Sequence, residues 1–528
     1  MQVRARVLRP PRMRFCDREV RVARHGSESY FIVGEGLLGE TLGGRRAALT
    51  GAGAAAPQFH FSRLGPKGVG KQLGEPNRTK IAEAMTVDNV SPGQIPAGFT
   101  YLGQFLDHDL TFDKSGLMEG ADISPATLLQ SRSPSLDLDS LYGNGPQDPL
   151  SAKFYEADGL HLKMGAAQGG PPGSDLPREA AGGSVGEAII PDPRNDENLA
   201  VAQTHSAFIR FHNRVLDTLP ASVPVAQRFR EARKIVTKHY QWMVRTDYLP
   251  RICAPAVVTN VFSQGRKAFE VGASPTSIPT MPIEFSVAAF RLGHSMIRAE
   301  YSWNKVFPNG TLSQLFDFSH LSGGLGGPIP SIWIADFRRL YNFGQLSPAP
   351  PALVVPAALF NRAMRIDTKL VDPLRVLRVP DPSPRNNLAF RNLLRANMVT
   401  LATGQQMVTF LKSKGVTLTK LTKPQIRDGK NGAELGALNA TQRNALLTNT
   451  PLWFYILREA ELNQGKLGGV GARIVAETFH RAIQGSTFSI VRDTAFRPSL
   501  GPNNTTFRMV DLLFFAFQGK ATLLNPNG

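Results

Sequence analysis

Residues 101–113 read YLGQFLDHDLTFD, and the interpretation of the whole chain starts from this stretch. If it is helical, Gln104, Asp107 and His108 are spaced i, i+3 and i+4, so their side chains share one face. Asp109 lies about 100° round the helix from His108 and points elsewhere. A histidine between two carboxylates is found at solvated helix ends as well as in reactive sites, so this segment alone does not distinguish a solvated helix end from a reactive site.

A second segment, residues 133–143, reads SPSLDLDSLYG. Its serines and aspartates alternate with apolar residues or proline, and alternate residues of an extended chain point to the same side. Hydroxyl and carboxylate oxygens gathered in this way suit a hard cation such as Ca²⁺, although a solvated turn would look similar. The segment lacks the glycine and the terminal glutamate of a helix–loop–helix calcium loop. Its oxygen-bearing side chains are Ser133, Ser135, Asp137 and Asp139.

Length and composition describe a large globular chain. Of its 528 residues, 42% are hydrophobic and 19% are charged, which excludes a wholly disordered protein. No apolar run reaches the roughly 18–20 residues of a membrane span. The two cysteines, Cys16 and Cys253, are too few for a disulfide-dense scaffold, a four-cysteine zinc site or a cysteine-ligated iron–sulfur cluster.

The chain is strongly basic, with 60 Lys and Arg residues against 42 Asp and Glu residues and a formal net charge of +18. Such a surface attracts polyanions, so polyanion binding is one expectation, although an ordinary basic surface explains the charge equally well. Residues 1–56 look like a basic N-terminal extension without the apolar core of a secretory signal peptide. The compartment therefore stays open between the cytoplasm and a signal-less export route, and the oligomeric state is open too.

Helical patterns dominate the remainder of the chain. Residues 200–219 and 226–249 carry apolar side chains at helical spacing, and residues 470–484 read as an amphipathic helix that packs on the core. The Gly- and Pro-rich residues 165–191 predict a long surface loop. Because few segments alternate like strands, we predict a mainly α protein with few short strands.

Together, residues 101–113 and 133–143 resemble the animal-type haem peroxidases, the family that includes myeloperoxidase and the peroxidase domain of cyclooxygenases. Further matching motifs follow in order: RNDEN at 194–198, IRFHNRV at 209–215, FRLGHSMI at 290–297 and RNLLR at 391–395. The resemblance implies one large helical haem peroxidase domain of the myeloperoxidase/cyclooxygenase type over residues 57–528, with the motifs strongest over 57–410. We expect the chain to be a bacterial member of this family.

The resemblance implies a role for each matching residue. His294 is expected to ligate the haem iron, and Asn392 to accept its ring N–H, which makes the imidazole more electron-donating. His108 is expected to be the distal base that moves the proton of H₂O₂. Arg194 is expected to stabilise the charge that develops as the O–O bond breaks. Gln104 is expected to position a water of the peroxide or a halide.

The resemblance further implies haem b and Ca²⁺ as cofactors. Asp107 and Glu197 match the carboxylates that esterify the haem in vertebrate enzymes, and Arg291 is expected to bind the haem as well. The expected activity is reduction of H₂O₂ through a ferryl intermediate, with oxidation of halides, thiocyanate or small aromatic donors. The residues that match the calcium site are Asp109, Ser133, Ser135, Asp137 and Asp139.

One residue departs from the myeloperoxidase pattern. Asn198 stands where myeloperoxidase has a methionine whose sulfonium link raises the haem reduction potential, and that link cannot form here. We therefore expect iodide, bromide, thiocyanate or phenols to be oxidised better than chloride.

Two alternatives to a peroxidase are considered. A cyclooxygenase-like fatty-acid dioxygenase would need a tyrosine three residues before His294, but Arg291 stands there, which disfavours it. A haem-bearing adhesion or interaction protein that acts through its basic surface is the second, and this role could coexist with catalysis.

Overall fold

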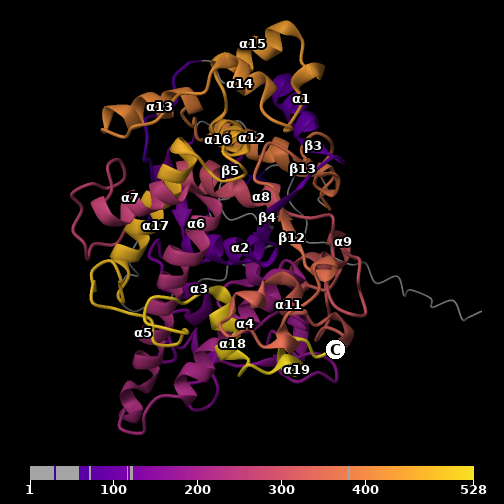
Figure 1. The fold of residues 1–528 in the computed structure, drawn as a ribbon, viewed down its shortest axis with the longest axis vertical. Helices are drawn as coiled ribbons and strands as arrows, with labels where there is room; N and C mark the ends of the chain where they lie inside the picture. The colour runs from indigo at the N-terminus through magenta and orange to yellow at the C-terminus, as the bar shows by residue number, and fades with distance from the viewer. Residues whose placement is uncertain are drawn as a thin grey trace, which may run out of the picture.

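Helices are the main regular structure in the computed structural model, which describes residues 29–30, 59–70, 73–113, 115, 117–118, 123–378 and 381–528 (Figure 1). The strand with the most residues in these ranges is β4 (Pro92–Pro96). The predicted mainly α fold with few short strands is therefore confirmed. The predicted basic extension, residues 1–56, and Cys16 lie outside the described residues, except that β1 (Ser29–Tyr30) pairs antiparallel with β5 (Leu117–Met118). Within the described ranges, no helix is long and apolar enough to cross a membrane.

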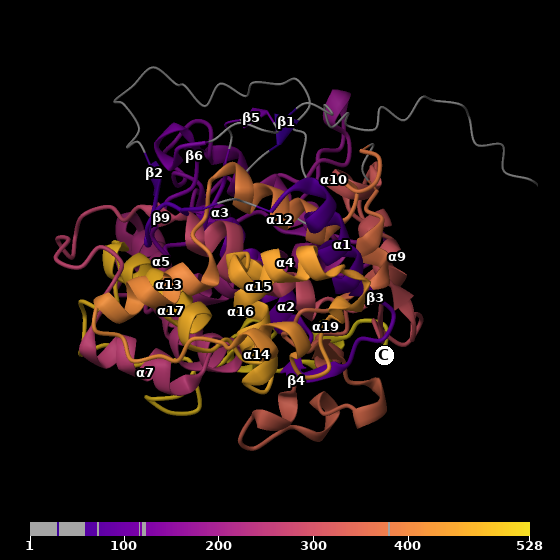
Figure 2. The same ribbon diagram turned by 90° about the horizontal axis from the view of Figure 1, so that it is seen from above.

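Helix α2 (Gly98–Leu110) lies in the interior of the molecule, with α4 (Leu199–Asp217) packed beside it (Figures 1 and 2). The Phe105 ring stacks on the Phe208 ring with 4.5 Å between centroids, which anchors α2 to α4. Tyr248 packs against α2 at Gly103, where a Cβ would lie 2.4 Å from the tyrosine hydroxyl. This packing fixes α2, and the reactive residues that it carries are held by the core rather than by a loop.

The predicted helices at residues 200–219 and 226–249 are confirmed as α4 and α5 (Val225–Met243), which continues through a π-helical turn at Val244–Tyr248 into α6 (Leu249–Ile252). Asn198 caps the start of α4, because its Oδ1 accepts a hydrogen bond from the Val201 amide at 3.0 Å. The other helices are α1 (Glu75–Met85), α3 (Asp139–Tyr142), α7 (Pro255–Gln264), α8 (Gly293–Met296), α9 (Leu312–Asp317), α10 (His320–Gly323), α11 (Phe337–Leu340), α12 (Leu388–Met398), α13 (Gly404–Ser413), α14 (Lys423–Asp428), α15 (Ala440–Thr448), α16 (Leu452–Leu462), α17 (Gly469–Gly485), α18 (Met509–Ala516) and α19 (Ala521–Leu524).

The strands form small separate sheets around the helices. The largest joins β2 to β6 on one side and to β9 on the other, and the remaining sheets in the described ranges are pairs of strands. The strands not yet given are β2 (Phe59–Ser62), β3 (Thr86–Val87), β6 (Leu129–Gln130), β7 (Gly165–Ala166), β8 (Pro172–Asp175), β9 (Met281–Pro282), β10 (Glu300–Tyr301), β11 (Gly310–Thr311), β12 (Arg362–Met364) and β13 (Leu370–Val371).

The prediction of a surface loop over residues 165–191 is wrong for its central part. Strands β7 and β8 form a hairpin that packs on α4, where the Gln203 Nε2 donates to the Ser174 carbonyl oxygen at 2.8 Å. The Arg178 guanidinium lies buried between the carboxylates of Asp175 and Asp196. Glycine and proline content predicted the turns, but it carries no information on the buried ion pairs of Arg178 with Asp175 inside the segment and with Asp196 just beyond it.

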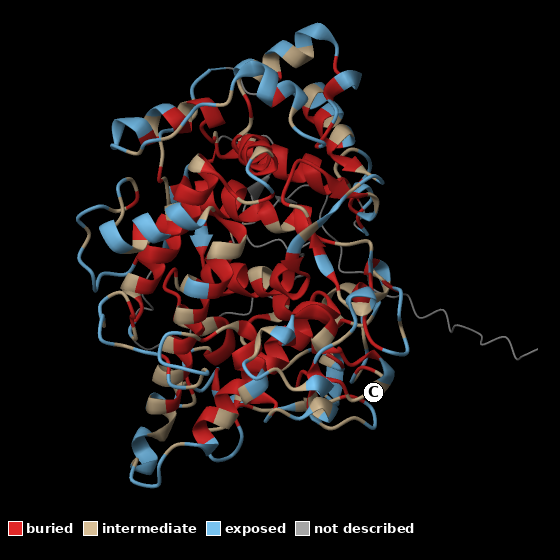
Figure 3. Ribbon diagram, viewed as in Figure 1, coloured by how far each residue is buried: buried red, intermediate tan, exposed pale blue. Residues whose placement is uncertain are grey.

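The expected helix at residues 470–484 exists as α17, and it lies within the core rather than at its edge, because nearly all of its residues are buried. Its charged residues are paired inside the protein: Arg473 with Glu477, and Arg481 with Glu270. Helix α17 lies beside α7 in both views (Figures 1 and 2). A continuous cluster of buried apolar side chains runs from Phe61 to Leu524, and the interior helices of Figure 3 are accordingly buried.

Candidate functional site

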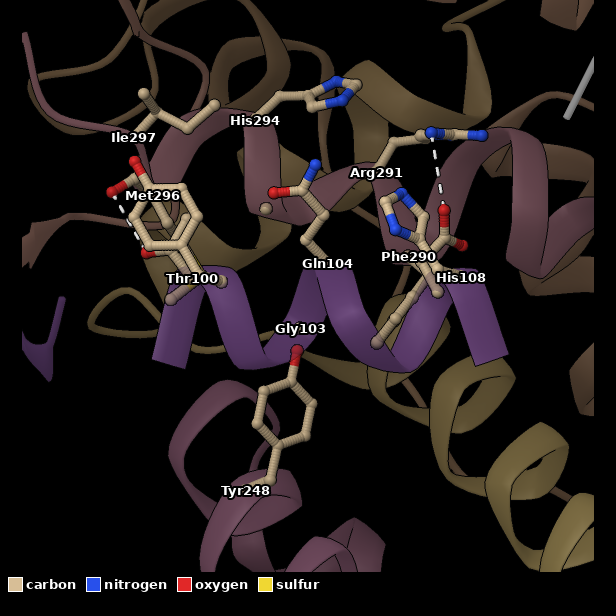
Figure 4. A pocket seen from close by; sticks show the side chains of 13 residues that line it. Thr100, Gly103, Gln104, His108, Tyr248, Phe290, Arg291, His294, Met296 and Ile297 are labelled. Atoms are coloured by element: carbon tan, nitrogen blue, oxygen red, sulfur yellow. Dashed lines mark hydrogen bonds and ion pairs between the residues drawn. The ribbon is translucent and has the colours of Figure 1, made fainter. Parts of the chain in front are cut away.

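A cavity lies between α2 and the segment around α8 (Figure 4). The helix α2 and the segment of residues 290–297 approach it from different sides, so that two histidines far apart in the sequence meet there. The lining residues are Thr100, Tyr101, Gly103, Gln104, Asp107, His108, Tyr248, Phe290, Arg291, Gly293, His294, Met296 and Ile297.

His294 enters the cavity from α8, and its ring is held by Asn392 of α12. Asn392 Nδ2 lies 2.8 Å from His294 Nδ1, and Asn392 Oδ1 is buried without a hydrogen-bond partner in the described residues. The hydrogen-bond network decides which way this amide is turned. With the Asn392 amide rotated by about 180°, its Oδ1 accepts the N–H of His294 Nδ1. Burial, followed by the charge of Arg291, lowers the pKa of His294 to about 3. The imidazole is therefore neutral, with Nε2 available as a ligand.

His108 lies on α2, one turn after Gln104, and is buried. Its Nδ1 lies 2.9 Å from Asn195 Oδ1, which is an acceptor only, so Nδ1 carries the proton and Nε2 holds the lone pair. Burial, followed by the Arg194 charge, lowers the pKa of His108 to about 3. The ring is therefore a neutral base at physiological pH.

Arg194 is fully buried and does not line the cavity. Its Nη2 donates to the carbonyl oxygens of His108 at 3.0 Å and Thr111 at 2.7 Å, and it pairs with Asp192 at 2.7 Å. Although burial opposes it, the guanidinium groups of Arg132 and Arg194 hold the pKa of Asp192 well below its usual value. Arg194 thus fixes the end of α2 directly behind His108.

Gln104 is held by the two residues that precede α4. Asn198 Nδ2 donates to Gln104 Oε1 at 3.0 Å, and Gln104 Nε2 donates to the Glu197 carboxylate. Because the other end of the Asn198 amide caps α4, the direction of the Gln104 amide is set by the helix start. Gln104 and Glu197, both expected in the site, are thus in direct contact.

Asp107 and Arg291 both line the cavity. The Arg291 Nη1 lies 3.7 Å from Asp107 Oδ2, and Thr111 Oγ1 donates to Asp107 Oδ1 at 3.3 Å. Burial raises the pKa of Asp107 even though Arg291 opposes the shift. Asp107 is thus a poorly solvated carboxyl group next to an otherwise mostly apolar cavity.

The segment at residues 133–139 meets Asp109 on the other side of α2. Asp109 accepts hydrogen bonds from the Leu138 and Ser140 amides and from the Ser140 and Tyr240 hydroxyls. The Ser133 amide donates to Asp139 Oδ2, and the Ser135 amide donates to Ser133 Oγ. This arrangement brings the five predicted calcium ligands into one region.

The three carboxylates of this region are poorly compensated. Burial, followed by the Asp139 carboxylate, raises the pKa of Asp137 to about 7, and the pKa of Asp109 is raised by the same causes. The Oδ1 atoms of Asp137 and Asp139 are buried without hydrogen-bond partners in the described residues. In these ranges, however, no three His, Cys, Asp or Glu side chains are grouped in the manner of metal ligands. The site therefore has the right oxygens, but they are not drawn together.

Residues 111–317 match the family model described as animal haem peroxidase. The chain is therefore similar to animal haem peroxidases over this part of its length. Its similarity to curated proteins is partial: thyroid peroxidase of Canis lupus familiaris is 30% identical over 179 residues, which cover 31% of this chain and 18% of that protein. Eosinophil peroxidase of Mus musculus is 28% identical over 192 residues, 35% of this chain and 23% of that protein. The chain thus spans about a fifth of the length of these relatives.

The solved structures that resemble this chain establish the fold alone. Peroxidase A from Dictyostelium discoideum superposes with a TM-score of 0.56 at 16% identity, covering 94% of this chain and 98% of that chain. The fatty acid alpha-dioxygenase of Oryza sativa superposes with a TM-score of 0.54 at 11% identity, covering 88% and 80%. A fold shared by both kinds of enzyme cannot separate their reactions, so the residues of the site must do so.

Two further buried residues lie beside His108 without a sequence pattern that indicates them. Asn195 lies inside the RNDEN motif at 194–198, and His205 lies on α4. Asn195 Nδ2 lies 3.0 Å from His205 Nδ1, and both residues are buried. This contact joins the turn at Pro193–Asp196 to α4, so helical spacing alone does not predict it.

Proposed function

We propose that the chain is a haem peroxidase that reduces H₂O₂ and oxidises halides, thiocyanate or small aromatic donors. The observation that carries this proposal is the pair of His108 and His294 on one cavity, each neutral and each held through Nδ1 by an asparagine. One histidine suits an iron ligand and the other a proton carrier, because both keep Nε2 free for the cavity.

The residues present fit a haem. The unpartnered Oδ1 of Asn392 is the acceptor that an iron-ligating His294 requires on its Nδ1–H. A Cβ at Gly293 would meet no heavy atom within 4 Å, so the chain leaves open space beside His294. When bound, the haem would supply the two electrons that peroxide reduction needs, and the donor would return them.

The side chains of the cavity would move and orient the protons. His108 Nε2 takes the proton from one peroxide oxygen and delivers it to the other, which leaves as water. Arg194, held behind the ring by Asp192, adds a fixed positive charge at the end of α2. The Gln104 amide, oriented by Asn198 and Glu197, presents its remaining N–H to a water or a halide.

We also propose that Asp107 and Glu197 form ester bonds to the haem. The contact of Asp107 with the cavity and that of Glu197 with Gln104 support this assignment. Joining either carboxylate to a haem methyl group would break a C–H bond and form a C–O bond, with loss of a proton and two electrons, and the H₂O₂ of the proposed reaction would be the oxidant. Haem that stays with the protein after acidic organic extraction in wild type, but not in a chain that carries both Asp107→Ala and Glu197→Ala, would support this part of the proposal.

Ca²⁺ is proposed for the region of Asp109, Ser133, Ser135, Asp137 and Asp139. A divalent cation would supply the partner that the orphaned oxygens of Asp137 and Asp139 lack, and would offset the repulsion between the carboxylates. Because Asp109 directly follows His108, binding there would hold the distal end of α2 in place.

We propose that residues 57–528 form the peroxidase domain. We also propose that its basic surface attracts polyanions, in line with the net charge of +18. Iodide, bromide, thiocyanate and phenols are the proposed donors, because Asn198 cannot make a sulfonium link. Fatty-acid dioxygenation remains less favoured, because position 291 carries an arginine paired with Asp107 rather than a tyrosine.

Rapid mixing tests the proposed function. The chain is loaded with haem and mixed with stoichiometric H₂O₂, while absorbance is recorded and bromide or phenol oxidation is followed. The account predicts a fast spectral change and donor oxidation. Oxygen uptake with linoleate in the absence of peroxide would instead favour the dioxygenase, and a protein that takes up haem but ignores peroxide would contradict the proposal.

A further inference from the structure

Asn195 lies between two buried histidines, and its amide contacts both of them. Its Oδ1 is 2.9 Å from Nδ1 of His108, and its Nδ2 is 3.0 Å from Nδ1 of His205. All three side chains are at most 1% exposed, so water does not compete for these contacts. The three residues therefore form one polar unit inside an otherwise apolar packing between α2 and α4.

An amide placed between two imidazoles makes their tautomers depend on each other. With Oδ1 toward His108, His108 must carry its proton on Nδ1, and His205 must accept on Nδ1 and carry its proton on Nε2. If the amide turned over, both tautomers would change: His108 would accept from Nδ2 and would carry its proton on Nε2. Only the first arrangement leaves a lone pair on Nε2 of His108.

We propose that Asn195 and His205 are positioning residues that select Nε2 of His108 as the proton-accepting atom. Asn195 makes the selection through its carbonyl oxygen, and His205 fixes which end of the Asn195 amide faces His108. This inference deepens the proposed peroxidase function and rests on it for its catalytic consequence, but the tautomer itself is a property of the chain alone.

The surroundings hold each member of the unit in place. The turn that carries Asn195, Pro193–Asp196, is capped by Asp192, whose Oδ1 accepts from the Arg194 amide at 3.0 Å. His205 lies inside α4, and the Phe105 ring of α2 packs edge-on against it with 5.7 Å between centroids. Neither ring can swing away without disturbing the contact between α2 and α4, so the amide is the part that decides the tautomer.

The experiment reads the tautomer directly, without haem and without turnover. The full-length chain is labelled with ¹⁵N at its 10 histidines, and long-range ¹H–¹⁵N spectra identify which ring nitrogen of each carries the proton. Signals of His108 and His205 are assigned by their loss in His108→Gln and His205→Phe. We expect Nδ1–H at His108 and Nε2–H at His205 in the wild type.

Two variants break the unit at different places. Asn195→Leu removes the acceptor, so His108 should lose its preference and show Nε2–H or a mixture of tautomers. His205→Phe leaves Asn195 in place but frees its amide to turn, so His108 should show a mixture of tautomers. Asn195→Asp keeps an acceptor toward His108, and it should therefore keep Nδ1–H there.

Asn213→Leu is the matched control. Asn213 is also a buried asparagine of α4, but both ends of its amide bind the backbone of Leu162, at 2.9 and 2.8 Å. Its loss should reduce stability without changing either tautomer. A His108 that is Nε2–H in wild type, that keeps Nδ1–H in Asn195→Leu, or that changes equally in Asn213→Leu would overturn the proposal.

The haem-loaded proteins separate this inference from the proposed function. If wild type reacts with H₂O₂, Asn195→Leu should react about 10- to 100-fold more slowly, at the lower end of what a general base contributes, whereas Asn195→Asp should keep most of the rate. If wild type does not react but shows the expected tautomers, the peroxidase proposal fails while the positioning of His108 stands. Equal rates in wild type and Asn195→Leu would contradict the positioning role.

Discussion

The two faces of α2 differ in how completely their polar groups are satisfied by the protein. On the cavity face, the Asn198 amide holds Gln104 and the Asn195 amide holds His108. On the same face, Asp107 lies next to Arg291. On the opposite face, Asp109 meets a segment in which Asp137 and Asp139 keep orphaned oxygens. The polar groups of the cavity face are thus bound by the protein, whereas the face around Asp109, the carboxylate face, keeps buried oxygens without hydrogen-bond partners in the described residues.

The largest expected effect comes from removing the proton carrier of the cavity face. His108→Ala in the haem-loaded protein should slow the reaction with H₂O₂ by about 10²- to 10⁴-fold, the usual contribution of a general base. Stopped-flow absorbance measures this rate. His212→Gln serves as the control, because His212 is also a buried histidine of α4 but bonds only to Tyr142 and the Leu160 carbonyl; a comparable loss in that variant would remove the special role of His108.

Removing the cation tests the carboxylate face. Chelation should lower the melting temperature of wild type, because a ligand present at 100 times its Kd stabilises the folded state by about 2.7 kcal/mol. In Asp137→Ala, the chelator should have little effect. Thermal unfolding followed by circular dichroism, with and without Ca²⁺, measures both. A wild-type melting temperature that ignores Ca²⁺ and chelator would show that this face needs no cation.

The same face should respond to pH once the cation is removed. The pKa of Asp137 is raised from 3.8 to about 7 in the folded chain, so the folded state keeps a proton that the unfolded state has lost. Stability therefore falls as the pH rises from about 4 through about 7. Melting temperatures in chelator should show this decrease in wild type, and it should be smaller in Asp137→Asn and in the presence of Ca²⁺. A wild-type melting temperature that rises over this pH range would contradict the prediction.

The smallest effect is expected at Asn198. Asn198→Ser keeps an oxygen to cap α4 but loses the N–H that orients Gln104, a hydrogen bond that contributes about 1 kcal/mol. Bromide oxidation should fall by a few-fold, whereas the reaction with H₂O₂ and the melting temperature should change little. Steady-state rates with bromide and with phenol measure the difference. An unchanged bromide rate would mean that the direction of the Gln104 amide does not matter.

Local pattern predicted much of this structure. The helical spacing of residues 101–113 placed Gln104, Asp107 and His108 on one face and Asp109 elsewhere, and α2 has this arrangement. Periodicity also predicted α4 and α5, because their buried faces follow the helical repeat. In such segments, the spacing of apolar residues that are close in the sequence is enough to predict the helix and its buried face.

Helical periodicity does not predict contacts between residues that are far apart in the sequence. Asn195 is 87 positions from His108, and no sequence pattern in either segment predicts their hydrogen bond. In α17, the helical pattern of residues 470–484 does not show that α7, α16 and the loop at 266–270 bury Arg473 and Glu477 as an ion pair. Burial of charge depends on which elements pack together, and that is decided by the tertiary fold.

The central claim is that His294, held by Asn392, binds a haem iron opposite His108. A haem titration of the wild type and of His294→Ala, followed by absorbance and magnetic circular dichroism, tests it most directly. The account predicts stoichiometric binding with the signature of a histidine-ligated iron in wild type, and loss of that signature in His294→Ala but not in His212→Gln. A wild-type chain that binds no haem, or a His294→Ala chain with an unchanged histidine-ligated spectrum, would contradict the account.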